Sequence, residues 1–238
     1  MNLDEQETAR YLLPTDAPEM SIYGVDERSK SPVREIMEAL VFSLVVFLLV
    51  QSVVQNREVL GQSMEPSLHN DERLFLDRLS YFRYDSNWLP RLLGHTDLPV
   101  SEQYLLGGPH RGDIVVFRPP VEGEKEDYIK RVIGVAGETV QVKAYDGVYI
   151  NGTRLDEPYI KEVPDYHWPA AGESGVVPAG HVFVLGDNRR NSSDSHLWGF
   201  LDQARIVGRA LISYWPREDW GLLPHPSYTP SEPTPSEP

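Results

Sequence analysis

The feature that most constrains this chain is a long run of uncharged, mostly apolar residues near its N-terminus. Residues 39–56, ALVFSLVVFLLVQSVVQN, carry no charge and would form a helix about 27 Å long at about 1.5 Å per residue. The hydrocarbon core of a bilayer is about 30 Å thick, and Ile36 and Met37 extend the apolar stretch backwards. The run is apolar on every side, unlike a helix that packs one face on a soluble core. We therefore predict one transmembrane helix over residues 36–56.

The charges that flank this run predict its orientation. Arg28, Lys30 and Arg34 precede the run. Arg57 and Arg73 follow it. Basic residues are enriched on the cytoplasmic side of membrane helices, and acidic residues contribute little to this bias. We therefore expect a cytoplasmic N-terminus, a single crossing of the membrane and a domain on the outer face.

The composition excludes several classes of protein. The chain of 238 residues has no cysteine, which excludes disulfides, zinc–thiolate sites and a cysteine nucleophile. Its 22 Lys and Arg against 36 Asp and Glu give a net charge of −14, which disfavours nucleic-acid binding because that needs a basic surface. No zinc-hydrolase, phosphate-loop or calcium-loop motif is present. We predict no metal, no cofactor and no nucleic-acid partner.

The remainder of the chain has the pattern of a β-rich domain over residues 57–216. Short runs of Val, Ile, Phe and Tyr alternate with Gly and Pro, which is typical of antiparallel sheets. We expect a mainly β fold, an antiparallel β-sheet domain anchored by one N-terminal transmembrane helix. Before and after it we expect a polar tail at 1–35 and a Pro-rich disordered tail at 217–238. Strands are expected at 73–79, 113–118, 128–135, 139–143, 148–150, 181–185 and 206–215, with a long loop at 83–110.

Two segments carry residues that could perform chemistry together. Ser63 lies in the sequence GQSMEPSL, close after the apolar run, and could be presented on an irregular turn. Lys130 lies in YIKRVIG, where side chains of a strand alternate between faces, so either Lys130 or Arg131 should point into apolar surroundings. A buried lysine has a lowered pKa and can act as a neutral base, which arginine cannot. Taken alone, the first segment is better explained as a loop serine and the second as a solvated pair of surface charges.

Four blocks in register resemble the type I signal peptidases, serine proteases with a Ser/Lys dyad. Residues 61–68 match G-x-S-M-x-P-[ST]-L, and residues 111–117 match R-G-D-I-V-V-F. Residues 128–138 match Y-I-K-R-V-I-G-x-x-G-[DE], and residues 186–195 match G-D-N-R-x-N-S-x-D-S. The resemblance covers roughly residues 33–216.

The resemblance implies roles for the matched residues. Ser63 would be the nucleophile, Lys130 the general base, and the Ser63 backbone N–H would help to bind the oxyanion. Ser192 resembles the serine that orients the lysine. Asp187 and Asp194 resemble structural acids, and we expect both to pair with Arg131.

The resemblance also implies the substrate, a preprotein with small residues at positions −3 and −1 before the cut. The candidate pocket residues are Val59, Leu60, Met64, Leu68, Tyr128 and Ile129. Residues 142–180 resemble the variable lobe of the family, to which we assign no chemistry. The expected setting is the plasma membrane of a bacterium, with lipid contact, a monomeric enzyme and the secretion translocon nearby. The exposed pattern Trp88, Leu92 and Leu93 suggests a further point of lipid contact.

Three departures from the family pattern leave alternatives open. Gly61 stands where many relatives have a serine that helps to form the oxyanion hole. Arg190 replaces a common acid, and His196 replaces a common arginine after D-S, so we expect a local structural difference around Asp194. One alternative is an anchored module that binds signal peptides or assembles a partner without cutting. A self-cleaving repressor also uses a Ser/Lys dyad, but the apolar run and the net charge argue against it.

Overall fold

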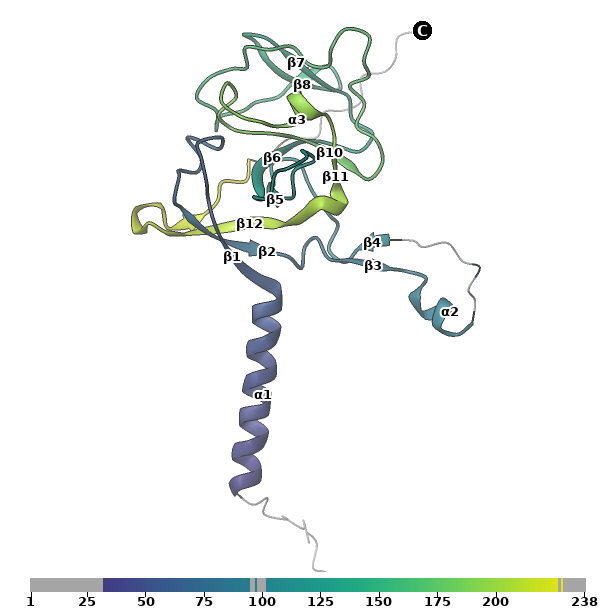
Figure 1. Ribbon diagram of the computed structural model, residues 1–238, viewed down its shortest axis with the longest axis vertical. Coiled ribbons are helices and arrows are strands. Elements are labelled where there is room, and N and C mark those ends of the chain that lie inside the picture. Colours follow the sequence, from purple (N-terminus) through teal and green to yellow (C-terminus); the bar gives the residue numbers. More distant parts are fainter. Residues whose placement is uncertain (1–31, 95–96, 98–101, 227, 229–238) are drawn as a thin grey trace, which may run out of the picture. The chain divides into compact units, whose positions relative to one another are not determined.

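A computed structural model describes residues 32–94, 97, 102–226 and 228 of the chain. The chain divides into two compact units, residues 1–45 and 46–238, and each is described by itself. Every strand among the described residues lies in the second unit (Figure 1). Most of the predicted polar tail and the end of the predicted C-terminal tail lie outside the described residues.

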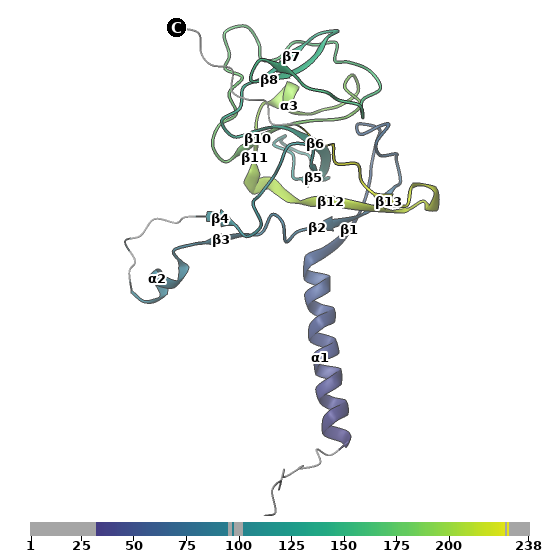
Figure 2. The same ribbon diagram turned by 180° about the vertical axis from the view of Figure 1, so that it is seen from behind.

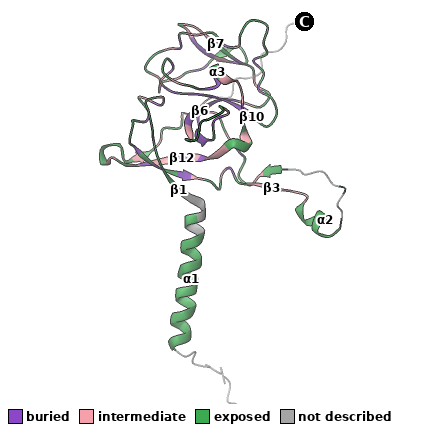
Figure 3. Ribbon diagram, in the orientation of Figure 1, coloured by how far each residue is buried: buried purple, intermediate pink, exposed green. Residues whose placement is uncertain are grey.

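Helix α1 covers Pro32–Val53 and is exposed at every side chain that is described (Figure 3). It begins before the predicted position 36 and ends three residues before 56, because Val54–Glu58 form strand β1 and pair with strand β2 instead. Among the described residues, no helix is long and apolar enough to cross a membrane. The predicted membrane-spanning helix is therefore not found there.

The main sheet is antiparallel and confirms the prediction of a mainly β fold (Figure 2). Its strand order is β1-β2-β12-β5-β6-β10-β11, and β13 pairs with β12. Strands of this sheet are β1 (Val54–Glu58), β2 (Arg73–Asp77), β5 (Ile114–Phe117), β6 (Tyr128–Val135), β10 (His181–Leu185), β11 (Leu201–Asp202), β12 (Ile206–Trp215) and β13 (Gly221–Leu222). Strand β5 is buried at all four positions, which accounts for its continuous apolar sequence IVVF.

A three-stranded sheet forms a separate lobe from β7 (Val140–Lys143), β8 (Gly147–Ile150) and β9 (Thr153–Arg154). The turn between β8 and β9 is Asn151-Gly152, with φ values of 50° and 81°. Positive φ at both central positions is the type I′ geometry that matches the twist of a hairpin, and Asn-Gly is its preferred sequence. The sequence Asn151-Gly152 therefore accounts for this hairpin.

Residues 83–110 are more regular than the predicted long loop. They contain a two-stranded sheet of β3 (Arg83–Asp85) and β4 (Glu102–Tyr104), and the short helix α2 (Trp88–Leu92) lies between these strands. Trp88, Leu92 and Leu93 are all exposed. Exposure at these positions is what lipid contact would need, and that contact stays a prediction.

Residues 217–226 are ordered structure and correct the prediction of a disordered tail from 217. The 3₁₀ helix η3 (Arg217–Asp219) and strand β13 follow β12 directly. Ile212 and Ser213 of β12 pair with Leu222 and Gly221, so the sheet supplies partners for a sequence that looks like a tail. Propensity alone does not reveal this pairing, because two residues are too short a run to show a strand pattern and their partner is the preceding strand β12.

The apolar side chains gather in three buried clusters around the main sheet. One cluster joins the loop that precedes β2 to the sheet and includes Val59, Met64, Leu68, Leu74, Leu76, Ile114, Val116, Ile129 and Ala210. A second lies between β6, β10 and the three-stranded lobe. The third packs β5 against β10 and β11 and reaches Trp198 of helix α3 (Ser195–Trp198). Strand β6 contributes to all three clusters, so its side chains are held from both faces.

Candidate active site

Ser63 lies on an irregular loop between β1 and β2 that the core holds at several points. Met64 and Leu68, on its C-terminal side, are fully buried. The Gly61 N–H donates to Asn70 Oδ1 at 2.7 Å. Gly61 has a φ of +89°, a conformation that side-chain-bearing residues rarely adopt, so this backbone favours glycine where many relatives have serine. The buried side chains of Met64 and Leu68 and the Gly61–Asn70 hydrogen bond thus hold the loop, while Ser63 stays partly exposed.

Lys130 lies on strand β6, and its side chain extends to Ser63. Its Nζ lies 2.6 Å from Ser63 Oγ and donates a hydrogen bond of 2.9 Å to the Ile129 carbonyl. The side chain is only 4% exposed. Burial lowers the pKa of Lys130 to about 8, although the negative charges of Asp194 and Asp187 act in the opposite direction. A substantial fraction of neutral amine therefore exists near physiological pH, next to a hydroxyl that it can deprotonate.

Asn188 holds the backbone of the nucleophile loop. Its backbone N–H donates to the Ser63 carbonyl at 3.1 Å, and its side-chain Nδ2 donates to the Gln62 carbonyl at 3.0 Å. The Gln62 carbonyl and the Ser63 N–H belong to the same planar peptide. Fixing the carbonyl therefore also fixes the direction of the Ser63 N–H, the group that the family pattern assigns to the oxyanion.

Gly186 allows the segment after β10 to lie directly against the Ser63 backbone. A Cβ at this position would overlap the Ser63 carbonyl oxygen and the hydroxyl of Ser192, so no larger residue fits. Ser192 therefore lies beside the nucleophile loop. Its Oγ is buried and has no hydrogen-bond partner among the described residues, Lys130 included. The geometry thus brings Ser192 to the site without the lysine contact that the sequence predicts.

Arg131 and Asp187 form a buried ion pair behind the dyad. Arg131 Nε and Nη2 contact the two Asp187 oxygens at 2.9 and 2.6 Å, and both side chains are fully buried. The sequence predicts that one of Lys130 and Arg131 points into the interior, and in the structure both are buried. Packed layers cover both faces of β6, so each of these adjacent side chains is enclosed by its own partners.

Asp194 does not pair with Arg131, which corrects the second expected ion pair. Its carboxylate accepts from the Gly186 N–H at 2.9 Å and lies 2.7 Å from His196 Nδ1. It also accepts from the His196 N–H and so caps helix α3. The His196 ring stacks on Tyr166 with centroids 3.9 Å apart. His196 therefore supplies the partner of Asp194 where relatives commonly have arginine.

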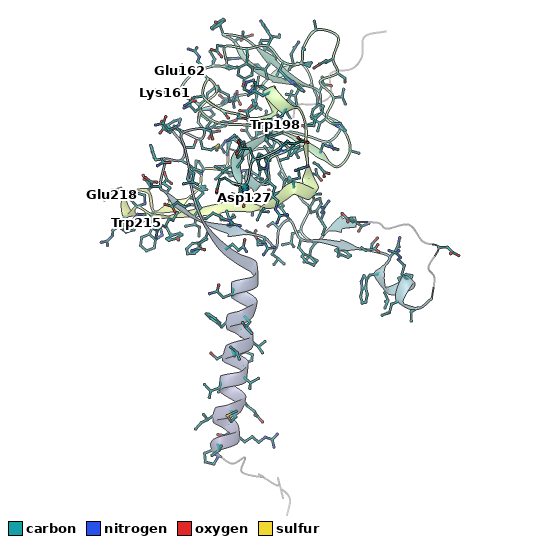
Figure 4. All side chains as sticks on the ribbon, viewed as in Figure 1. Asp127, Lys161, Glu162, Trp198, Trp215 and Glu218 are labelled. Carbon is teal, nitrogen blue, oxygen red and sulfur yellow. The ribbon has the colours of Figure 1, made fainter. Side chains whose placement is uncertain are left out.

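The departure at Arg190 lies away from this network. Its guanidinium contacts Glu162 at 3.0 Å, and both side chains are largely exposed. Figure 4 shows Glu162 on the lobe that carries β7 and β8, apart from Asp127 near β6. The change at Arg190 thus leaves the contacts of Ser63 and Lys130 intact.

An open cleft of about 580 Å³ leads to the dyad. Four of the six predicted pocket residues line it, namely Val59, Leu60, Tyr128 and Ile129. Met64 and Leu68 do not, because both are packed in the core beneath the loop. The sequence did not indicate the remaining lining residues, which are Arg57, Glu58, Gly61, Gln62, Asn70, Leu74, Val116, Asp127, Asn191 and Ser193. The wall is thus mixed, with apolar groups beside Ser63 and an ion pair of Arg57 and Asp127 at 3.4 Å.

Comparison with known proteins identifies the family. The profile described as "Signal peptidase, peptidase S26" matches residues 33–215, more than half of the chain. The chain belongs to the signal peptidase family. It is therefore an enzyme of a family of serine endopeptidases, which confirms the resemblance seen in the four sequence blocks.

Several relatives align over most of the chain. "Signal peptidase I" of Leptolyngbya laminosa is 36% identical over 84% of this chain and 89% of its own. "Probable signal peptidase I-1" of a Synechocystis strain is 37% identical over 84% of this chain and 91% of its own. A crystal structure of a signal peptidase I from Enterococcus faecalis is 38% identical, with a TM-score of 0.37, and covers 42% of this chain and 95% of that chain.

One group of described residues has the ligand types of a metal site. Atoms of His69, Glu72 and Asp219 lie within 4.8 Å of one another. Glu72 already accepts hydrogen bonds from the His69 backbone and from Ser213 Oγ. The group also lies outside the residues that line the cleft, so it has no part in the chemistry of Ser63.

Sequence reasoning missed several supporting residues. Arg189 is buried, donates to the Gly186 carbonyl at 3.1 Å and pairs with Glu157. Asn188 and Arg189 lie inside the matched G-D-N-R block, so their position in that block was the available signal. Glu157 lies in the lobe to which no chemistry was assigned. No local pattern marks it, because its role depends on a contact across 32 residues.

Proposed function

We propose that this enzyme removes signal peptides from exported preproteins, with Ser63 as nucleophile and Lys130 as general base. The observation that carries the proposal is the 2.6 Å separation of Lys130 Nζ and Ser63 Oγ at the end of an open cleft. Burial supports it, since an amine with a pKa of about 8 can accept a proton near neutral pH.

The proposed reaction has two steps. Neutral Lys130 takes the proton of Ser63 as Oγ attacks the scissile carbonyl, and the charged amine then protonates the leaving amine. The Ser63 N–H, whose peptide Asn188 holds, would donate to the developing oxyanion. Lys130 next removes a proton from water as the water oxygen attacks the acyl-enzyme, and it then returns this proton to Ser63 Oγ as the ester bond breaks. Asn188 and the Arg131–Asp187 pair act as positioning residues, since they contact the loop and strand rather than the substrate.

We propose that the cleft selects small residues at −3 and −1 through steric limits. Val59 and Ile129 are buried and form firm walls beside Ser63. A wall of packed core side chains cannot retreat without losing contacts, so a larger substrate side chain would be rejected.

The test of this function is cleavage of a preprotein whose signal ends in A-x-A. Purified full-length enzyme in detergent is expected to cut after the second alanine, as read by mass spectrometry of both products. The matched substrate with phenylalanine in place of that alanine is expected to react at least about 10²-fold more slowly, because its ring does not fit the cleft. Tight binding of the A-x-A substrate without any cut would favour the non-catalytic binding module instead.

We also propose that the N-terminal apolar segment holds the enzyme at the bacterial plasma membrane. The support is the uncharged run of residues 39–56 together with the exposed apolar side chains of α1, which water solvates poorly. The full chain is expected to stay in the membrane fraction after alkaline carbonate extraction. A variant that lacks residues 1–53, and so keeps β1, is expected to be released. Release of the full chain by carbonate would contradict the proposal.

A further inference from the structure

The last stretch of the chain that the structure describes lies beyond the residues that match the family. The match ends at residue 215, yet residues 223–226 and Tyr228 are packed against the domain. We refer to these residues as the C-terminal strap. Leu223 packs against the core cluster beneath the Ser63 loop, and Tyr228 packs against the cluster between β6 and β10. The strap therefore joins two parts of the core that flank the dyad.

The strap completes the hydrogen bonds of Arg131. A guanidinium has five N–H donors, and it cannot lose its charge in a protein. Three of the acceptors come from Asp187 and Ser67, with Ser67 Oγ at 3.3 Å. Nη1 donates to the Gly112 carbonyl at 3.0 Å and to the Pro224 carbonyl of the strap at 3.1 Å. Without the strap, a buried donor would lose its partner.

The strap also covers the turn that supplies another of these acceptors. A Cβ on Gly112 would meet Tyr228, His225 and the Pro226 carbonyl, so the strap lies directly on this residue. His225 Nε2 lies 3.1 Å from Asp113 Oδ1. The Tyr228 hydroxyl donates to the Tyr159 hydroxyl at 2.8 Å, and the Tyr159 ring lies 4.1 Å from the Arg131 guanidinium. Strap residues thus contact Arg131 and two of the groups that enclose it.

We infer that the C-terminal strap is a positioning element of the active site, which seals the Arg131–Asp187 pair and thereby fixes Lys130 and the loop that carries Asn188. Arg131 is the neighbour of Lys130 on β6, and Asp187 is the neighbour of Asn188. This inference rests on the proposed function of Ser63 and Lys130, and it adds a part that the family match does not include.

The cleft residues distinguish this role from substrate binding. No strap residue is among those that line the cleft, so loss of the strap should change kcat and leave KM nearly unchanged. It should also admit water beside Arg131 and Lys130. Asp187 and Asp194, with their partners Arg131 and His196, are the charged and titratable groups around this amine. Hydration favours the ammonium form, so the acidic limb of the rate profile should move to higher pH.

The test compares two truncated forms of the full chain with wild type on the A-x-A preprotein. The form that ends at Leu222 lacks the strap, and the control that ends at Tyr228 keeps it. The control is expected to match wild type. The strapless form is expected to lose at least tenfold in kcat with KM within twofold, and its acidic limb should shift upward. Amide hydrogen exchange at residues 111–113 and 186–189 should be faster only in the strapless form.

Each result decides the inference separately from the proposed function. A folded strapless form with wild-type kcat, pH profile and exchange rates would overturn the inference while wild-type cleavage still supported the function. If wild type fails to cut, the function is contradicted and the exchange rates alone test the strap. Should the strapless form not fold, Tyr228→Leu and His225→Ala replace it. A threefold or larger loss of kcat at constant KM in either is expected, and wild-type values in both would overturn the inference.

Discussion

Replacing Lys130 with methionine is expected to reduce kcat/KM by at least about 10⁴-fold, because Lys130 Nζ lies 2.6 Å from Ser63 Oγ and no other base of the described residues contacts that oxygen. Methionine has a similar volume and carries no charge, so it should fill the buried site without loss of stability. Ser63→Ala is expected to have an equal effect, and the double variant should be no worse than either alone, since the two residues act as one unit. Rates on the A-x-A preprotein, with circular dichroism to check folding, measure this.

The pH dependence of the wild type is the second part of the same expected result. Lys130 must be neutral to act as a base, and burial lowers its pKa to about 8. Below that pH the neutral fraction, and with it kcat/KM, should fall about tenfold per unit, while above it the rate should level off. Substantial activity of folded Lys130→Met would contradict the lysine base. A limb near 6.5 in the wild type would indicate a histidine instead.

Replacing Arg131 with methionine is expected to cost the largest amount of stability, about 3–5 kcal/mol. The change removes the cation and leaves the Asp187 carboxylate buried without its partner. It also removes donors from the Gly112 and Pro224 carbonyls. A domain of this size loses roughly 2–4 °C in Tm per kcal/mol, so thermal unfolding should shift down by about 10 °C.

Arg190→Met is the matched control for this prediction. Each change replaces one ion-paired arginine by methionine. The Arg131–Asp187 pair is buried, whereas the Arg190–Glu162 pair is exposed. Exposed pairs contribute little because water already solvates both charges, so the control should change stability by no more than about 1 kcal/mol. Equal losses in the two variants would contradict the account in which burial makes Arg131 costly to remove.

The local sequence pattern predicted the strands well where the strand is buried, because buried strands are rich in apolar residues. IVVF and YIKRVIGV became β5 and β6, and the Asn151-Gly152 turn formed as its sequence indicates. The same reasoning was wrong about Asp194, which pairs with His196 rather than with Arg131. It was also wrong about Met64 and Leu68, which are core anchors of the Ser63 loop. Whether Arg131 reaches Asp194, and whether Met64 and Leu68 face the cleft, depends on how distant segments pack. No single stretch of sequence contains that information.

The tail after β12 illustrates the same limit. A Pro-rich sequence with few apolar residues indicates disorder, yet the edge of β12, the buried Arg131 and the Gly112 backbone together offer it partners. These three partners come from separate parts of the chain. The folded domain presents them as one surface, so the order of the tail depends on the rest of the fold.

The sequence by itself determined the family, the antiparallel β character and the identity of Ser63 and Lys130 as the pair to test. It could do so because hydrophobic period and motif spacing are local properties. Only the tertiary structure decided that Lys130 and Ser63 meet at 2.6 Å, that both faces of β6 are buried, and that the strap closes over Arg131. The physical reason is that desolvation and hydrogen-bond partnership arise only when distant segments enclose a group together.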